Sequence, residues 1–230
     1  MIFKKIESLF TTSIEYQDYL LHGTITAINL ALIVAIISAS LQAWGIFRQN
    51  KLLKKNKSAT ALPLSFFAFQ FFYFMAYLIY GLKIGSISLM ISNVVGVLFL
   101  PIIITLVKFK QIENASFKNE LLISPLLALI IPCVVFIRKE WSLIAVLILA
   151  TIVFTHLVIE IIRKREIRNI EPRFIISFIL CSLVWLWYGI EISDFGLITS
   201  SATTVSVGIA FSFFYLFMKR SFKKSPATIN

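Results

Sequence analysis

Seven long apolar runs are the feature that most limits how this 230-residue chain can fold. A helix needs about 20 apolar residues to cross a hydrocarbon core about 30 Å thick. The runs that approach or exceed this length are 24–47, 62–82, 84–107, 121–137, 141–162, 174–190 and 195–218. The fourth run is short and contains Pro125 and Pro132, but 59% of all residues are hydrophobic, well above the usual content of soluble domains. The sequence therefore predicts an all-α integral membrane protein with seven transmembrane helices.

The basic residues predict how these helices are oriented. Of the 22 Lys and Arg residues, 17 lie in segments 48–57, 108–118, 163–173 and 219–224, which share one side of the membrane only if the number of spans is odd. Short loops rich in Lys and Arg face the cytoplasm. We therefore expect the N-terminus outside and the C-terminus in the cytoplasm, in a plasma membrane. Since topology accounts for the net charge of +11, we expect no nucleic-acid partner.

The chain lacks the motifs of enzymes, metal sites and cofactor sites. Its cysteines, Cys133 and Cys181, both fall in predicted spans, where cysteine behaves as a small apolar residue. No paired carboxylates, nucleophile with a base, or cluster of metal ligands converges at one depth. Residues 1–23 form a polar lead without the apolar core and cleavage site of a signal peptide. We predict a protein that is not an enzyme and needs no metal or cofactor.

An internal repeat links the first three apolar runs to the last three. The pair Tyr80-Gly81 recurs as Tyr188-Gly189, at an offset of 108 residues. Further matched pairs flank both glycines: Tyr77 and Trp185 four positions before, Asn93 and Ser201 twelve positions after, and Pro63 and Pro172 eighteen and seventeen positions before. Repeated units of this length indicate a duplicated structural element.

Two three-helix units can have the same orientation in the membrane only if an odd number of spans connects them. The fourth run is therefore the predicted linker helix. The predicted plan is 3+1+3, with two parallel three-helix bundles. The expected segments are an extracytoplasmic lead at 1–23, a first bundle at 24–107, a linker with the fourth helix at 108–140, a second bundle at 141–218 and a cytoplasmic basic tail at 219–230.

The motifs of the repeat resemble those of a known transporter family. The shared pattern is aromatic-x-x-Tyr-Gly, then an acid five residues after the glycine, a polar residue at twelve and a further glycine. It is carried by 185–189, Asp194, Ser201 and Gly208 in the second repeat and by 77–81, Asn93 and Gly96 in the first. This pattern is similar to that of the SWEET (MtN3/saliva-like) sugar transporters, their half-size bacterial relatives and the wider PQ-loop group.

The resemblance spans 24–218 and implies a sugar site and gating hinges. It implies substrate contacts at Asn93, Ser201, Trp185 and Tyr77 and hinges at Pro63 and Pro172. This chain departs from the family at the Pro-Gln motifs, where it has Leu41-Gln42 and Thr155-His156, and at the second family asparagine, which is Ser201 here.

Each candidate residue also has a structural interpretation. Parallel repeats place the substrate near the middle of the membrane, between the halves, and Asn93 and Ser201 lie near that depth in their runs. Asn93 could instead tie two helices together, and Ser201 could be an ordinary packing residue. Trp185 and Tyr77 could offer an aromatic face to a sugar, or simply pack in a chain with 22 Phe.

The mechanism expected from the sequence is facilitated diffusion of a small neutral polar substrate, most simply a sugar. Ion coupling needs a charged group in the pathway, and no Asp or Glu lies near mid-depth in any predicted span. A proton-coupled amino-acid or vitamin carrier would use His156 or Glu160, and a membrane receptor or trafficking protein would bind a partner without transport. One chain holds both repeats, so a monomer can form a pathway, and the sequence leaves a homo-oligomer open.

Overall fold

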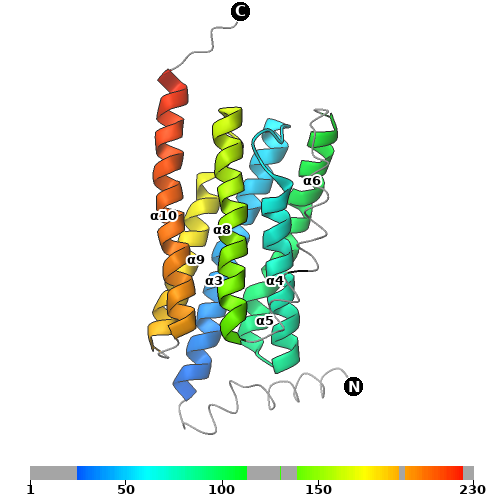
Figure 1. Ribbon diagram of the computed structural model, residues 1–230. Coiled ribbons are helices and arrows are strands. Elements are labelled where there is room, and N and C mark those ends of the chain that lie inside the picture. Colours follow the sequence, from blue (N-terminus) through cyan, green and yellow to red (C-terminus); the bar gives the residue numbers. More distant parts are fainter. Residues whose placement is uncertain (1–24, 113–129, 131–138, 192–194, 225–230) are drawn as a thin grey trace, which may run out of the picture.

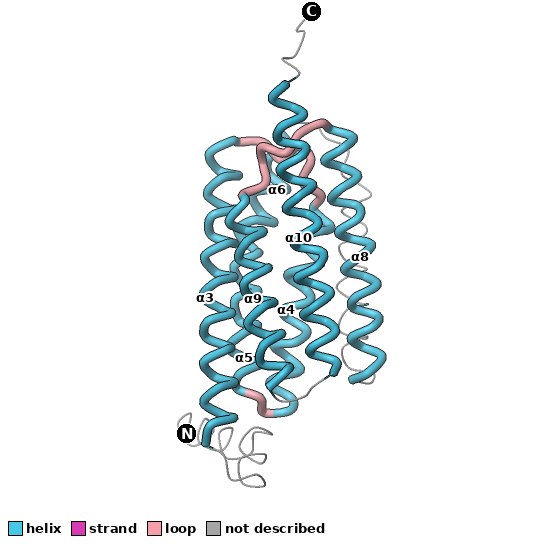
Figure 2. The backbone as a smooth tube through the Cα atoms, turned by 90° about the vertical axis from the view of Figure 1, so that its left-hand side faces the viewer, coloured by secondary structure: helices cyan, strands magenta, loops and turns pink. Residues whose placement is uncertain are grey.

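The computed structural model describes residues 25–112, 130, 139–191 and 195–224, and these parts are helical with no strand. The helices run along one long axis, and the connections described between them lie at the two ends of the bundle (Figures 1 and 2). In chain order they are α3 (Ile25–Asn56), α4 (Leu64–Ile84), α5 (Ile87–Val94), the 3-10 helix η1 (Val95–Leu98), α6 (Phe99–Ile112), α8 (Lys139–Lys164), α9 (Pro172–Glu191) and α10 (Phe195–Lys224).

Five of the described helical segments are long and apolar enough to cross a membrane. They are Leu30–Asn56, Leu64–Leu82, Ile87–Ile112, Pro172–Ile190 and Ile198–Ser221, which correspond to the first, second, third, sixth and seventh predicted runs. The fifth run, 141–162, lies within α8. Apart from Ile130, the fourth run, 121–137, lies outside the described residues, as does the lead at 1–23. The chain is thus an all-α integral membrane protein, and its seven-helix plan stays a prediction.

The sequence placed the end of the first helix too early. We expected a basic loop from Arg48, but α3 continues through this stretch to Asn56. Arg, Lys, Gln and Leu are good helix formers, so the helix persists beyond its apolar part. It stops where Lys57 adopts a left-handed conformation with φ of 51°. Hydropathy identifies the part of a helix that lies in the membrane, but it does not identify where a helix that extends beyond the membrane ends.

The third predicted run is helical from Ile87 to Ile112, but it is not α-helical throughout. Gly85 ends α4 in a left-handed conformation, with φ of 72°, and the Ser86 hydroxyl accepts a hydrogen bond from the Leu89 amide at the start of α5. The helix then tightens into η1 before α6. Pro101 explains the change, because it has no N–H to donate and its ring clashes with the carbonyl four residues earlier.

Helix ends recur at the offset that the sequence motifs define. α3 ends at Asn56 and α8 at Lys164, while α4 begins at Leu64 and α9 at Pro172, each 108 residues apart. The connecting turns match too. Lys57 and Arg165 both have positive φ, and the bond from the Leu62 amide to the Ala59 carbonyl recurs between Ile170 and Ile167.

The helices of each repeat pack in the same order. The third helix of the first repeat (α5, η1 and α6) contacts both α3 and α4, and α10 contacts both α8 and α9. Between the repeats, α3 packs against α9 and α4 contacts α8. Glycines allow close approach within each half, since a Cβ on Gly96 would clash with Phe74 and one on Gly208 would lie 2.6 Å from Ile179. The first helix of each repeat thus contacts the second helix of the other, which is the pattern expected of two related halves.

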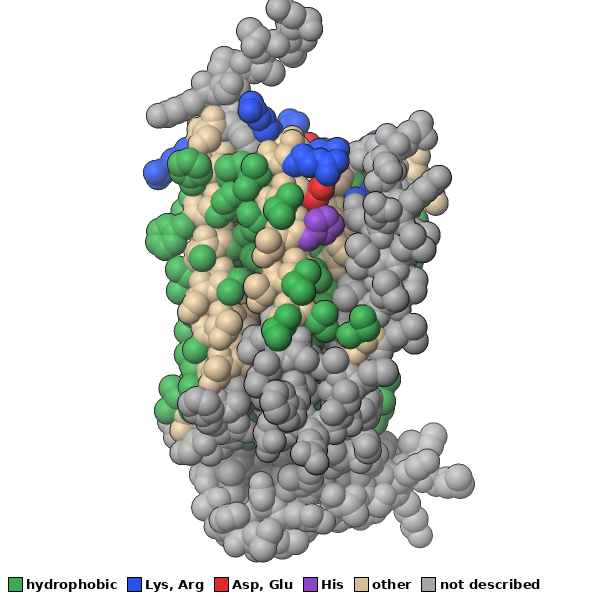
Figure 3. Space-filling model, in the orientation of Figure 1, with side chains coloured by type: hydrophobic (Ala, Val, Ile, Leu, Met, Phe, Trp, Pro, Cys, Tyr) green, Lys and Arg blue, Asp and Glu red, His purple; other side chains and the backbone are tan. Residues whose placement is uncertain are grey.

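Described basic side chains gather at one end of the bundle, where α3, α6, α8 and α10 finish and α4 and α9 begin (Figure 3). We call this the basic end. The last turns of α3 and α8 carry Lys54, Lys55, Arg163 and Lys164 there. The sides of the bundle expose many large apolar residues, as a lipid-facing surface requires.

Candidate functional site

A cavity of about 480 Å³ lies between the two repeats and is lined from α3, α4, α5, α8, α9 and α10. Its volume is in the range of small-molecule sites, about 300–1,000 Å³. The four residues predicted to bind substrate, Asn93, Ser201, Trp185 and Tyr77, all line this one cavity. No described lining residue is charged, and none is a histidine. The cavity is therefore chemically suited to a neutral ligand.

Asn93 is held in a fixed orientation on α5. Its Nδ2 donates to the Leu89 carbonyl at 2.7 Å and to the Ser92 hydroxyl at 3.1 Å, and the side chain is buried. These bonds lie within α5 itself, so Asn93 does not tie α5 to another helix through them. No described residue donates to Asn93 Oδ1. The carbonyl oxygen is thus an acceptor available to a ligand.

Ser201 differs from the other hydroxyl residues of α10. Thr203 and Thr204 donate to the carbonyls of Thr199 and Ser200, four residues back, at 2.8 and 2.9 Å. Such bonds within the helix satisfy a hydroxyl in an apolar surrounding. Ser201 is buried and lines the cavity, yet its hydroxyl bonds to no described residue. It therefore keeps a donor and an acceptor for a ligand.

The second helix of each repeat contributes one predicted aromatic side chain to the cavity wall. Trp185 lies on α9, with its ring edge-on to Tyr188 at a centroid distance of 5.8 Å. Its indole N–H has no described partner. Tyr77 lies on α4 and packs on Tyr73 at 4.9 Å. An aromatic face covers the C–H surface of a ring, and an indole N–H adds a directed donor.

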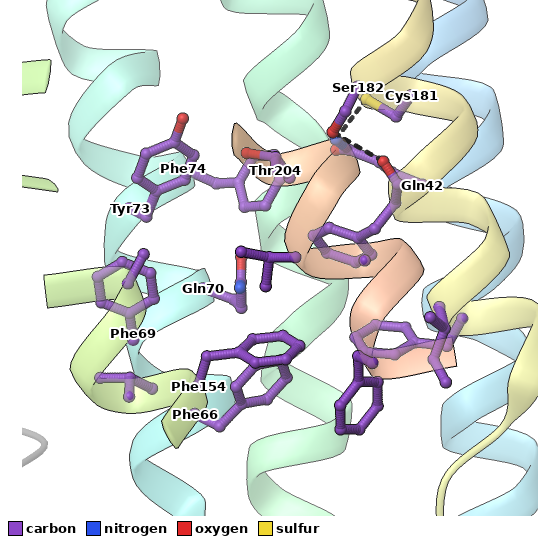
Figure 4. Close-up of a pocket in the computed structure, with 18 of the residues that line it drawn as sticks. Gln42, Phe66, Phe69, Gln70, Tyr73, Phe74, Phe154, Cys181, Ser182 and Thr204 are labelled. Atoms are coloured by element: carbon purple, nitrogen blue, oxygen red, sulfur yellow. Dashed lines mark hydrogen bonds between the residues drawn. The ribbon is translucent and has the colours of Figure 1, made fainter. Parts of the chain in front are cut away.

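The cavity is also lined by polar residues that the sequence motifs do not identify, notably Gln42 and Gln70. Gln42 appeared only as part of the altered Pro-Gln motif, although its Nε2 donates to Cys181 Sγ at 2.8 Å and its buried Oε1 has no partner. Cys181, Ser182 and Gln42 form one polar edge of the cavity, while Gln70 projects from α4 (Figure 4). Helical spacing from Tyr77 would have found Gln70, since Phe66, Gln70 and Tyr73 follow one helix face.

The predicted hinge residues both lie at the basic end, at helix starts. Pro63 is the N-cap residue of α4, and Pro172 is the first residue of α9. In the repeat register Pro172 matches Leu64, one position later than Pro63. Proline is favourable at a helix start because its missing N–H needs no partner there.

A polar clasp joins the repeats at the basic end, and no sequence motif predicts it. We define it as Gln49, Asn56, Thr60, Asn169 and Glu171. Gln49 on α3 donates to the Asn169 carbonyl at 2.7 Å and accepts from the Glu171 amide at 2.9 Å. Asn169 Oδ1 accepts from Asn56 at 3.0 Å, and Asn169 Nδ2 donates to the Thr60 carbonyl at 3.0 Å. Gln49 and Asn169 are almost fully buried, so both connecting loops are fixed to α3.

The residues that a proton-coupled mechanism would use lie outside this cavity. His156 does not line it, and its Nδ1 lies 3.1 Å from the Ser65 hydroxyl at the start of α4. Glu160 pairs with Arg163 one turn later at 3.3 Å. The first is a hydrogen bond between α4 and α8, and the second is an ion pair within α8.

The second repeat is similar in sequence to a known transporter family. Residues 142–223, which span α8 to α10, match the sequence model of the family described as sugar efflux transporter for intercellular exchange, MtN3_slv. The match shows that this segment, the second repeat, is similar to the SWEET (MtN3) family. Its members form a family of sugar transporters, which agrees with a membrane protein whose helices surround an uncharged cavity. No curated protein matches the chain.

The segment that matches the SWEET family model is the second repeat, α8 to α10. The first repeat is related to that segment through the common offset of helix ends and turns. Ser201 and Trp185 lie inside the matched segment, while Asn93 and Tyr77 are their counterparts in the first repeat. The family is one of transporters, which is consistent with a protein that is not an enzyme.

Proposed function

We propose that this protein is a facilitative carrier, a uniporter, of mono- or disaccharides that works by alternating access around the central cavity. The supporting observation is an uncharged cavity between the repeats whose walls carry unused hydrogen-bonding groups: Asn93 Oδ1, Ser201 Oγ, Gln42 Oε1 and the Trp185 indole. The proposal includes the 3+1+3 plan with the fourth helix in 108–140, and a plasma membrane with the N-terminus outside.

The cavity walls combine the two surfaces that a sugar needs. A sugar ring has apolar C–H faces and a rim of hydroxyls, each of which can donate and accept. Trp185 and Tyr77 supply aromatic area, and Asn93 and Ser201 supply an acceptor and a hydroxyl. A buried polar group without a partner costs about 1–3 kcal/mol, which a bound hydroxyl would recover. These groups are the substrate contacts of the proposal.

The same walls favour transport down the substrate's own gradient. Proton coupling needs a titrating group in the pathway, and the described lining residues include no Asp, Glu, Lys, Arg or His. His156 contacts Ser65 and Glu160 contacts Arg163, so the residues of the proton-coupled alternative are engaged elsewhere. This supports a uniporter over the proton-coupled alternative.

Alternating access requires the basic end to open and close, and the polar clasp is the element that closes it in this proposal. Its hydrogen bonds run between α3 and the loop that precedes α9, so release of substrate at this end requires them to break. Pro63 and Pro172 lie at the starts of the helices that would move, and we assign them the role of hinges.

The test is uptake of [14C]glucose and [14C]sucrose by purified protein in liposomes. We expect time-dependent uptake of at least one of these sugars, and a loss of about 100-fold in Trp185→Ala, since the aromatic face and the N–H are lost together. The matched control is Trp187→Ala. Trp187 lies two residues away on α9, is 47% exposed and does not line the cavity, so its variant should transport normally.

Two results would count against this function. Binding of either sugar without flux in liposomes would favour a receptor, and full uptake by Trp185→Ala would remove Trp185 from the substrate site. Insertion and folding of each variant are checked by its elution as a single species in detergent.

A further inference from the structure

Gln70 is a cavity residue that neither the repeat motifs nor the family pattern singles out. It lies on α4, four residues after Phe66 and three before Tyr73, and this spacing places the three residues and Tyr77 on one face of the helix. All four line the cavity. In Figure 4 the Gln70 side chain lies in the middle of the view, among labelled aromatic residues.

The carboxamide of Gln70 has unused hydrogen-bonding capacity. It makes no hydrogen bond to any described residue, although an amide offers two donors and two acceptor sites. Its neighbours on the lining face of α4 are the rings of Phe66, Phe69 and Tyr73. A polar group among apolar rings is costly unless a ligand or water bonds to it.

The second repeat shows that the fold does not need an amide at this place. The residue 108 positions later is Phe178, on the corresponding part of α9, and it also lines the cavity. Phe178 packs on the ring of Phe174, which is the residue equivalent to Phe66 in the first repeat. The same helix position thus holds a ring in one half and an amide in the other, which points to a role in ligand recognition.

We propose that Gln70 is a specificity-determining residue that hydrogen-bonds a hydroxyl of the bound sugar. Because its counterpart Phe178 has no polar group, this contact exists on one side of the cavity only. The sugar therefore binds in one orientation relative to the two repeats. This inference rests on the proposed function, since it requires a sugar in the cavity.

The test compares wild type and Gln70→Leu in liposomes, with whichever of [14C]glucose and [14C]sucrose the wild type transports and with the monodeoxy analogues of that sugar as competitors. Loss of one neutral hydrogen bond should raise the half-saturating concentration about 10-fold. One deoxy analogue, the one without the contacted hydroxyl, should compete equally well in both proteins. The melting temperature should not fall, because no described hydrogen bond is removed.

The matched control is Gln111→Leu, the same substitution at an exposed residue of α6 outside the cavity. It should leave the half-saturating concentration unchanged. Unchanged affinity in Gln70→Leu, or an equal loss for the parent sugar and every deoxy analogue, would overturn the inference and leave the proposed function intact. If the wild type transports neither sugar, the proposed function fails and this inference with it.

Discussion

The two repeats share a backbone plan but line the cavity with different chemistry. Equivalent positions 108 residues apart carry amides in the first repeat and apolar or hydroxyl side chains in the second. The pairs that line the cavity are Gln42 with Ala150, Gln49 with Leu157, Gln70 with Phe178 and Asn93 with Ser201. The starts of the second and third helices, the turns and the packing order of the two halves nevertheless agree.

This difference separates what the fold needs from what a ligand needs. Features present in both halves, such as the helix starts at Leu64 and Pro172, belong to the architecture. Features present in one half only are free to serve recognition or gating. A symmetric cavity would bind a sugar equally in two orientations, whereas amides on one wall and hydroxyls on the other favour one of them.

The largest difference between the repeats should appear at Asn93 and Ser201. We expect Asn93→Ala to lower the initial rate of sugar uptake in liposomes about 100-fold, because a fixed acceptor is lost and a substrate hydroxyl is left unpaired. Ser201→Ala should lower it by no more than about 10-fold, since Ser200 and Thr204 also line that wall. Equal losses in the two variants would show that both repeats contribute equally to substrate binding, which would contradict the proposed difference between them.

A smaller effect is expected at the polar clasp, which is also asymmetric. The positions equivalent to Gln49 and Asn169 are Leu157 and Ala61, so the other half has no such clasp. Gln49→Leu leaves the Glu171 amide without its partner, at a cost of about 1–3 kcal/mol. The basic end should then open more often, and a membrane-impermeant maleimide added at that end should label Cys181 in the cavity about 10-fold faster.

This labelling experiment uses a Cys133→Ser background, so that Cys181 is the single thiol in the chain. Gln111→Leu is again the control, because Gln111 is exposed in the last turn of α6 and makes no hydrogen bond to a clasp residue. A labelling rate that does not change in Gln49→Leu would mean that the clasp does not close the basic end.

Much of the architecture could be predicted from the sequence, because lipid imposes a length on each span and the repeat imposes a register. The register also selected Asn93 and Ser201, which line the same cavity. The path of α3 past Arg48 could not be predicted, because hydropathy does not distinguish a polar helical turn from a loop. The break at η1 was likewise hidden, since Pro101 lies within an apolar run.

The glutamines were missed for a different reason. A membrane helix is apolar on most of its faces, so hydropathy does not say which side faces a cavity. Gln70 can be found only by tracing the face of α4 that carries Tyr77 back towards the start of the helix. The pairing of Gln49 with Asn169 joins residues 120 positions apart, and no local pattern predicts such a contact.

The most direct test of the account is the final distribution of a transported sugar across the liposome membrane with and without an imposed pH gradient. A uniporter with an uncharged cavity should bring internal and external concentrations of the [14C]-labelled sugar to the same value in both conditions. Accumulation above the external concentration that follows the pH gradient and collapses with a protonophore would contradict the account.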